Sequence, residues 1–338
     1  MNNDSRSIPK STLLHRLLAR FPESGVLIVF VLTALTFTLG LVLQSLWENS
    51  SPSSFAGLEN TTSILTRSAV IGIIACGVSL LMIAGEFDIS VGSVMVLAIY
   101  VFTGLTKLDF PPPVAMSGAL LAGAAAGLVN GLITLLLNIP SFITTLGTML
   151  FWRGIVIYLL AGSFMSYQGN EEWLAPFGSV LFSQFRMSVV WFFAVAGILQ
   201  IILVRTPFGN WTFAAGGDAQ AARNVGVPVY RVKLICFTLC GALSALAGIS
   251  YVARYKTMQV SVGQGFELEA IAAAVIGGNM LTGGRGSILG TVIGVVFVSM
   301  IRNGLIHLLD SSYLHYPVTG VLLIVAVIIN RKITTLTH

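Results

Sequence analysis

Charged residues are scarce in this sequence. Only 9% of its 338 residues are Asp, Glu, Lys or Arg, whereas about a quarter is usual in a soluble domain. The mean hydropathy is +0.89 and 55% of the residues are hydrophobic, so little polar sequence is left to coat a water-soluble core. This balance excludes a disordered chain, a soluble nucleic-acid-binding domain and a secreted disulfide scaffold. It predicts a membrane protein with many spans, because the bilayer is the solvent that suits so much apolar sequence.

Cysteine and histidine are also few. The three cysteines, Cys76, Cys236 and Cys240, lie in apolar runs, so we expect small buried side chains and neither ligands nor bridges. The four histidines are scattered without metal-ligand spacing. No Gly-x-Ser-x-Gly elbow and no pairing of histidine with an acid supports an intramembrane enzyme. The sequence therefore predicts no catalytic residue, no metal site and no cofactor in this chain.

Long apolar runs fill most of the sequence. Since a helix needs about 20 apolar residues to cross a bilayer, the runs predict an all-α polytopic membrane protein with about ten transmembrane helices (range about 8–11), some short or broken. Loops of at most about 30 residues are too short to form a soluble domain. The expected spans are 26–47, 66–84, 91–106, 114–136, 141–160, 187–204, 231–251, 267–280, 286–306 and 316–330.

The distribution of basic residues predicts the orientation. With ten spans, most Lys and Arg residues fall on one face, which the positive-inside rule assigns to the cytoplasm together with both termini. The expected organisation is a cytoplasmic segment 1–25, a transmembrane domain 26–330 with cytoplasmic loops near 205–230 and 277–287, and a cytoplasmic tail 331–338. The basic residues on this face are Arg6, Lys10, Arg16, Arg20, Arg205, Arg223, Arg231, Lys233, Arg285, Arg331 and Lys332.

A polar segment interrupts the apolar sequence between the second and third expected spans. It reads Gly85-Glu-Phe-Asp-Ile-Ser-Val-Gly-Ser93 and holds two carboxylates and two hydroxyls. Intramembrane acids usually face a cavity or a partner, and a broken helix offers backbone groups to a polar solute. The alternative is a tight turn at the interface, with solvated acids and with Ser90 capping the next helix. The spacing alone does not choose between these two interpretations.

A hydroxyl stripe follows the fourth expected span. Pro140 and Ser141 predict a helix start, and Ser141, Thr144, Thr145 and Thr148 fall on one face of that helix. Such a stripe lines a polar path or makes hydrogen bonds between helices. Arg153, farther along the same helix, requires an acidic partner or an aqueous cavity.

Two loops on the basic face contain turn-forming residues. In the first, Asp218 is expected to cap a short helix from Ala219 to Asn224, which Gly226 and Pro228 end. In the second, a helix of small residues leads into a Gly-rich turn around Gly283 and Arg285. That turn lacks the Lys and Ser or Thr of a phosphate-binding loop, so it suits a docking surface for another protein better than a nucleotide site.

These segments together resemble a known family. The sequence is similar to the membrane-spanning permease subunits of ABC sugar importers, the ribose and galactoside permease family, over roughly residues 60–330. Glu86 is a departure, since many members have an apolar or a different polar residue there, which bears on the substrate. The resemblance rests on Gly85–Ser93, Pro140–Gly147, Thr206–Gly209 with Ala221–Gly226, Glu269–Gly278, Gly283–Gly290 and Asn303–Leu305.

The resemblance implies a division of labour. A separate ABC ATPase subunit binds ATP and Mg, a second permease chain completes a homodimer or heterodimer in the lipid of a bacterial inner membrane, and a periplasmic sugar-binding protein delivers the solute; nucleic acid has no part. The solute is a sugar or sugar-like molecule. The expected substrate path is Glu86, Asp88, Ser90, Ser93, Asn130, Ser141, Thr144 and Thr145. The expected ATPase-coupling residues are Ala219, Ala222, Arg223, Gly226, Gly277, Gly278, Gly283, Gly284 and Arg285.

A different class of transporter also fits part of the sequence. Secondary carriers bind their coupling ion at intramembrane acids, and here Glu86 and Asp88 are the candidates. An ATP-driven importer stops when ATP is depleted, whereas an ion-coupled carrier stops when an uncoupler collapses the gradient.

Overall fold

A computed structural model describes residues 57–181, 184–309, 317–321, 324 and 328. The expected first span, most of the last one and both terminal segments lie outside these residues. Helices dominate the described chain, with four two-residue strands beside them. The helices are α3 (Leu58–Ile83), α4 (Val91–Lys107), α5 (Pro112–Leu137), α6 (Ser141–Leu160), α7 (Ala175–Gly178), α8 (Met187–Arg205), α9 (Pro207–Gly217), α10 (Ala219–Asn224), α11 (Val229–Tyr255), α12 (Phe266–Ile276) and α13 (Ile288–Leu309), with the 3-10 helix η1 (Glu171–Leu174).

Six of these helices are long and apolar enough to cross a membrane: α3, α5, α6, α8, α11 and α13, the last counted over Ile288–Ile306. Helix α4 is apolar and only slightly shorter, with 17 residues. The all-α polytopic fold predicted from the apolar runs is thereby confirmed. The expected span 267–280 differs: α12 has 11 residues, about 16 Å of helix, and this is too short to cross a bilayer.

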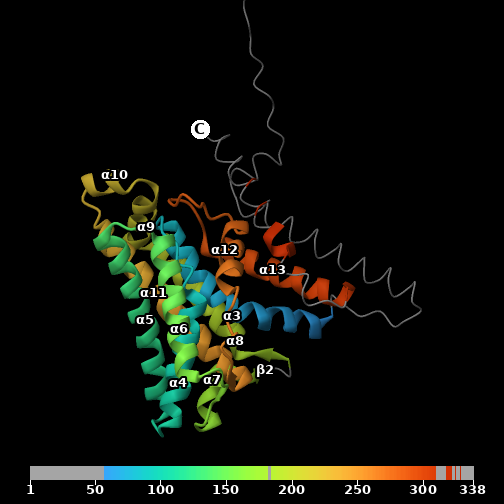
Figure 1. Cartoon of the computed structure of the whole chain (residues 1–338). Helices are drawn as coiled ribbons and strands as arrows, with labels where there is room; N and C mark the ends of the chain where they lie inside the picture. Colours follow the sequence, from blue (N-terminus) through green and yellow to red (C-terminus); the bar gives the residue numbers. More distant parts are fainter. Residues whose placement is uncertain (1–56, 182–183, 310–316, 322–323, 325–327, 329–338) are drawn as a thin grey trace, which may run out of the picture.

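The long helices form a bundle with two distinct ends (Figure 1). Helices α9 and α10 lie at one end, beside the loop that follows α12. Helix α7 and strand β2 (Val180–Leu181) lie at the opposite end. We call these the α9–α10 end and the outer-loop end.

Glycine allows the central helices to approach closely. Helix α11 packs against α3, α4 and α5 in the middle of the bundle. A Cβ atom at Gly127 of α5 would lie 2.2 Å from the carbonyl oxygen of Phe237, and one at Gly241 of α11 would lie 2.1 Å from that of Gly123. These glycines therefore allow α5 and α11 to pack backbone against backbone.

Apolar side chains point outward from the bundle. Leu121 of α5, Leu150 of α6 and Ile201 of α8 are each more than half exposed. In water such surfaces would be costly, but lipid accommodates them. The three cysteines are buried and unpaired, as expected.

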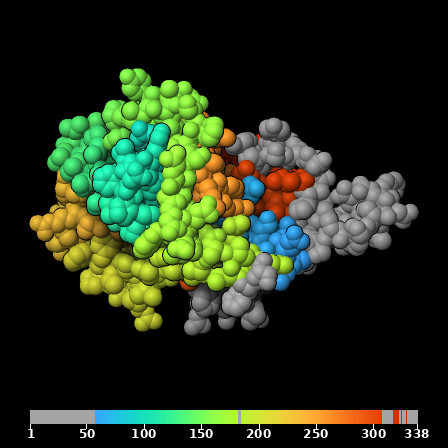
Figure 2. Space-filling view, turned by 90° about the horizontal axis from the view of Figure 1, so that it is seen from below, coloured from blue at the N-terminus to red at the C-terminus, as the bar shows by residue number. Residues whose placement is uncertain are grey.

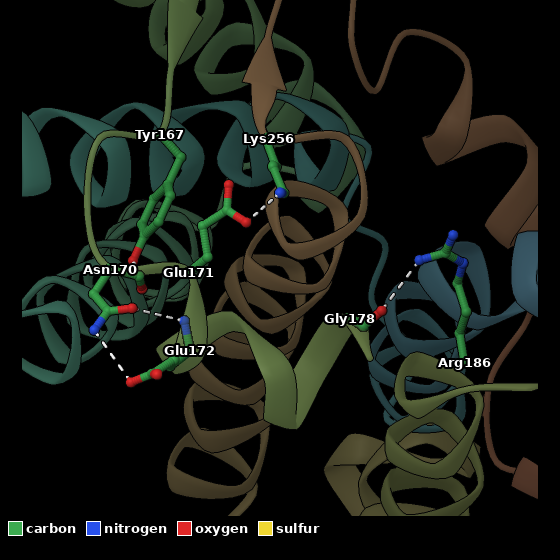
Figure 3. Close-up of polar contacts among 7 residues, drawn as sticks. All are labelled: Tyr167, Asn170, Glu171, Glu172, Gly178, Arg186 and Lys256. Carbon is green, nitrogen blue, oxygen red and sulfur yellow. Dashed lines mark hydrogen bonds and ion pairs between the residues drawn. The ribbon is translucent and has the colours of Figure 1, made fainter. Parts of the chain in front are cut away.

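A folded loop closes the outer-loop end (Figure 3). Strand β1 (Met165–Ser166) pairs with β4 (Thr257–Met258), and β2 pairs with β3 (Phe185–Arg186). Lys256 forms an ion pair with Glu171 at 2.5 Å, and Asn170 caps η1 by accepting from the backbone N–H of Glu172. Burial, with Glu171 adding to it, raises the pKa of Tyr167, so its hydroxyl remains a donor to the Asn170 carbonyl at neutral pH.

Candidate functional site

The turn between α3 and α4 contains a closed polar cluster. One carboxylate oxygen of Asp88 accepts hydrogen bonds from the backbone N–H and the hydroxyl of Ser90, at 2.7 and 2.6 Å. Asn130 of α5 donates to the other carboxylate oxygen at 3.2 Å and to the Ser90 hydroxyl at 2.8 Å. All three residues are fully buried. Asp88 is therefore held by neutral donors, and no cation contacts it among the described residues.

The hydroxyl stripe of α6 holds the same turn. Ser141 accepts from the backbone N–H of Phe87 at 3.1 Å, and Thr145 accepts from that of Ile89 at 3.2 Å. Unpaired backbone N–H groups are costly away from water, so these bonds stabilise the nonhelical turn inside the bundle. For Ser141 and Thr145, the stripe therefore makes hydrogen bonds to a neighbouring segment, the second of the two roles expected from the sequence.

The structure thus corrects part of the tight-turn interpretation. Ser90 is the N-cap residue of α4, but its side chain makes no capping bond, because its hydroxyl donates to Asp88 instead. Asp88 is buried and not solvated. The cluster brings Asp88, Ser90, Asn130, Ser141 and Thr145 together; their predicted role in a substrate path stays a prediction.

Glu86, at the start of the same turn, faces the α9–α10 end. Its carboxylate forms an ion pair with Lys233 of α11 at 2.6 Å, with each side chain 13% exposed. The pair lines a cavity of about 850 Å³, which also contains Arg223, Arg231 and Thr134. Glu86 is therefore neutralised by a cation and stands apart from the Asp88 cluster.

Two further predicted path residues have different environments. Ser93 accepts a hydrogen bond from Arg153 at 3.2 Å. Arg153 also donates to the carbonyl oxygens of Val260 and Val262, at 2.8 and 3.2 Å. These carbonyls belong to a nonhelical stretch that no sequence pattern had singled out. The Thr144 hydroxyl is buried without a hydrogen-bond partner.

The two predicted coupling loops are joined by backbone contacts at the end of α3. The N–H of Gly284 donates to the carbonyl of Ile83 at 2.9 Å. A Cβ atom at Gly216, in α9, would lie 1.9 Å from the same carbonyl oxygen. Gly283 has a φ of +80° and sits against Gly85, where a Cβ would lie 2.7 Å from the Gly85 Cα. Both loops therefore contact the end of α3, and Gly283 also contacts the start of the turn that carries Asp88.

Helix α10 forms as the sequence predicts, from Ala219 to Asn224. The Asp218 side chain accepts from the backbone N–H groups of Gln220 and Ala221, both at 2.9 Å. Ala222 is buried, and Arg223 and Gly226 are exposed. Val225 is 80% exposed, an apolar contact point that the motif search missed because valine is unremarkable in such a sequence.

The residues of the second loop divide in the same way. Gly277 and Gly283 are buried, Gly284 is half-buried, and Gly278 and Arg285 are exposed. Position 277 has no room for a side chain, because a Cβ atom at Gly277 would lie 2.4 Å from the carbonyl carbon of Gly290. The exposed members are the ones accessible to another protein.

A second buried polar cluster fixes the Gly-rich loop. Asn279 donates to Ser79 of α3 and, at 3.0 Å, to Thr291 of α13. Its side-chain oxygen accepts from the backbone N–H of Ser287 at 2.8 Å. Sequence reasoning missed this residue, since its partner Ser79 lies 200 positions away along the chain.

Comparisons with known proteins agree with this architecture. The family described as "Branched-chain amino acid transport system / permease component" matches residues 60–327. The chain belongs to this permease family. It is 34% identical to the ribose import permease protein RbsC of Bacillus subtilis over 87% of the chain and 91% of that protein. It is 35% identical to RbsC of Escherichia coli K12 over 86% and 91%.

A more distant relative is named for the import of a different solute. The chain is 27% identical to the autoinducer 2 import system permease protein LsrC of Salmonella paratyphi B, over 88% of the chain and 86% of that protein. No solved structure matches the chain. As a member of this permease family it is a multi-pass membrane protein and a component of a transport system.

Proposed function

We propose that this chain is the transmembrane permease subunit of an ATP-binding-cassette importer for a sugar or sugar-like solute: a pentose, a hexose or a polyol. The observation that carries the proposal is the similarity to two ribose import permeases along almost their whole length. The solute moves from the periplasm to the cytoplasm, and ATP is hydrolysed on a separate subunit.

The geometry of the α9–α10 end supports a coupling role. Arg223 is exposed in the last turn of α10, Val225 and Gly226 are exposed just after it, and Gly278 and Arg285 are exposed on the Gly-rich loop. Both loops reach Ile83 through Gly216 and Gly284. An ATPase subunit that pushes on these residues would shift the end of α3 and bias the equilibrium between two states of the bundle.

The basic residues at the α9–α10 end indicate how the protein is oriented in the membrane. Arg205, Arg223, Arg231, Lys233 and Arg285 belong to the loops and helix ends at the α9–α10 end. The positive-inside rule assigns this end to the cytoplasm, which leaves the outer-loop end for a periplasmic binding protein. A second permease chain, identical or homologous, completes the conduit.

The ion-coupled carrier is less well supported. Its two candidate ion sites are Glu86, which Lys233 already neutralises, and Asp88, which three hydrogen bonds from neutral donors hold in a closed cluster. Glu86 therefore already has a cationic partner, and Asp88 is fully buried.

Reconstitution tests the proposal. The permease is placed in liposomes with its ATPase and binding protein, and uptake of radiolabelled D-ribose, D-galactose and a polyol is measured. We expect uptake of at least one solute that requires ATP inside and is insensitive to a protonophore. Concentrative uptake by the permease alone, or uptake abolished by the protonophore, would overturn the proposal.

A further inference from the structure

The chain between α11 and α12 is not helical. After α11 ends at Tyr255, β4 covers Thr257–Met258, and turns continue to Gly265. The backbone hydrogen bonds within these turns are local: the N–H of Val262 donates to the carbonyl of Gln259, and the N–H of Gln264 donates to that of Ser261. Helix α12 then supplies just 11 residues. We call residues 259–265 the unwound stretch.

The unwound stretch runs alongside α4, within the helix bundle. At its start, Met258 pairs with Met165 in the β1–β4 ladder, and Met165 contacts the hydroxyl of Thr103 near the end of α4. At its other end, the carbonyl of Gly263 would lie 2.4 Å from a Cβ at Gly92, near the start of α4. Gly92 and Thr103 are about 16 Å apart along the helix axis, so the stretch reaches well below the outer-loop end.

Nonhelical backbone at this depth is tolerated only where protein buries it or where it lines a water-filled cavity. Arg153 satisfies two of its carbonyls, those of Val260 and Val262, and is itself tied to α4 through Ser93. The guanidinium therefore covers one side of the stretch. No other described side chain donates to these two carbonyls.

The other side of the stretch carries polar side chains that are exposed in the part of the chain that the structure describes. Gln259, Ser261 and Gln264 are exposed, and so is Gly154, next to Arg153 on α6. Figure 2 shows orange atoms of this part of the chain at the surface, between the light green of α6 with the outer loop and the blue of α3. Two amides and a hydroxyl facing hydrocarbon would be costly, so this side is unsuited to contact lipid.

We propose that Gln259, Ser261 and Gln264 line the solute path, and that Arg153 is the positioning residue that keeps the stretch unwound. Uncharged donors and acceptors suit the hydroxyl groups of a neutral sugar or polyol. The acids nearby do not compete for this role: Glu267 accepts from the N–H of Gly265, and Glu269 is paired with Arg302 at 2.9 Å. This inference deepens the proposed function and rests on it for the identity of the solute.

Water access is tested without knowing the solute. Gln264→Cys and Ser261→Cys are placed in the full transporter in nanodiscs, and labelling by the impermeant cation MTSET is compared with that of Ile201→Cys. Ile201, on α8, is 60% exposed and apolar, which makes it the lipid-facing control. The parent protein, with its three buried cysteines, gives the background.

We expect both path positions to label at least tenfold faster than Ile201→Cys, and Arg153→Met to change their rates while leaving the control rate unchanged. Arg153→Lys, which keeps a donor, should restore the rates toward the parent pattern. Labelling of both positions no faster than the control would overturn the path assignment. If one variant fails to assemble, the other position and Gln259→Cys decide.

A transport measurement separates this inference from the proposed function. Gln264→Ala and Ser261→Ala are assayed for uptake of radiolabelled D-ribose and D-galactose with ATPase activity in parallel. Uptake reduced at least fivefold with ATPase activity retained supports the path assignment, and unchanged uptake in both variants refutes it. Should the parent carry no pentose, hexose or polyol, the proposed solute class fails, while the labelling pattern still decides where the path lies.

Discussion

Gly216 is in direct backbone contact with Ile83: a Cβ atom at Gly216 would lie 1.9 Å from the Ile83 carbonyl oxygen and 2.7 Å from the amide nitrogen of Gly284. The contact joins α9, the end of α3 and the Gly-rich loop at one point. Since Gly284 donates to the Ile83 carbonyl, the three segments meet at this one carbonyl group.

Gly216→Ala should separate these segments. The added methyl cannot be accommodated without a backbone shift, so we expect a loss of about 1–3 kcal/mol of stability and loss of ATPase stimulation by the loaded binding protein. Gly217→Ala is the matched control, because its Cβ would find its nearest neighbour at 3.8 Å. Thermal unfolding in detergent and ATPase assays measure both variants; equal behaviour of the two contradicts the junction.

Asp88→Asn should be tolerated, whereas Asp88→Leu should not. The Asn130 side-chain oxygen has no hydrogen-bond partner, so a flip of that amide would let it accept from the new amide of Asp88→Asn. Leucine instead leaves the donors of Ser90 and Asn130 unsatisfied, at about 1–3 kcal/mol each. The thermal unfolding midpoint of each variant checks this.

Asp88→Asn also tests whether transport is coupled to protons through Asp88. Asparagine cannot release a proton, so a carrier that relays protons through Asp88 would lose uptake in Asp88→Asn. We expect ATP-driven uptake to persist in that variant at half the parent rate or more. Loss of uptake in a variant that remains as stable as the parent would speak for a role of the carboxylate itself.

The sequence predicted what depends on local rules. The apolar runs gave the long helices, Asp218 predicted α10 with its cap, and Pro140 predicted the start of α6.

The rest depends on contacts between distant residues. Arg153 lies over a hundred positions from the carbonyls that it satisfies, and no pattern within α6 names them. The sequence predicts an ordinary loop before a full span at 267–280, because the Ala-rich segment is apolar enough for a span. Its hydropathy does not reveal that the helix ends after 11 residues. Asp88 was assigned to solvent or to a path, and only Asn130, from another helix, shows that its cluster is closed.

Glu86→Gln should destabilise the protein by on the order of 1–3 kcal/mol, less than a fully buried pair. The change leaves Lys233 uncompensated in a cavity that also holds Arg223 and Arg231. Glu86→Gln combined with Lys233→Met should recover most of the loss, since the double variant has no unpaired charge at this position. A double-mutant cycle on thermal unfolding measures the coupling; additive losses would show that the ion pair contributes nothing.

Asn279→Ala should loosen the Gly-rich loop. Its side chain bonds Ser79, Thr291 and the N–H of Ser287, so removing it strips a buried backbone donor and two hydroxyls of a partner. At about 1 kcal/mol or more for each bond, we expect a loss of about 2–4 kcal/mol and weaker ATPase stimulation. Thr291→Val should cost less, because only the hydroxyl is removed and the shape is kept.

Asn224→Ala is the control for this prediction, since Asn224 is exposed at the end of α10. Its thermal unfolding midpoint should match that of the parent within about a degree, because exposed substitutions away from special contacts usually change stability by about 0.5 kcal/mol or less. If Asn279→Ala were as stable as this control, the loop would be held by its glycine contacts alone. The ATPase assay on the same samples would then tell whether rigidity of the loop matters for coupling at all.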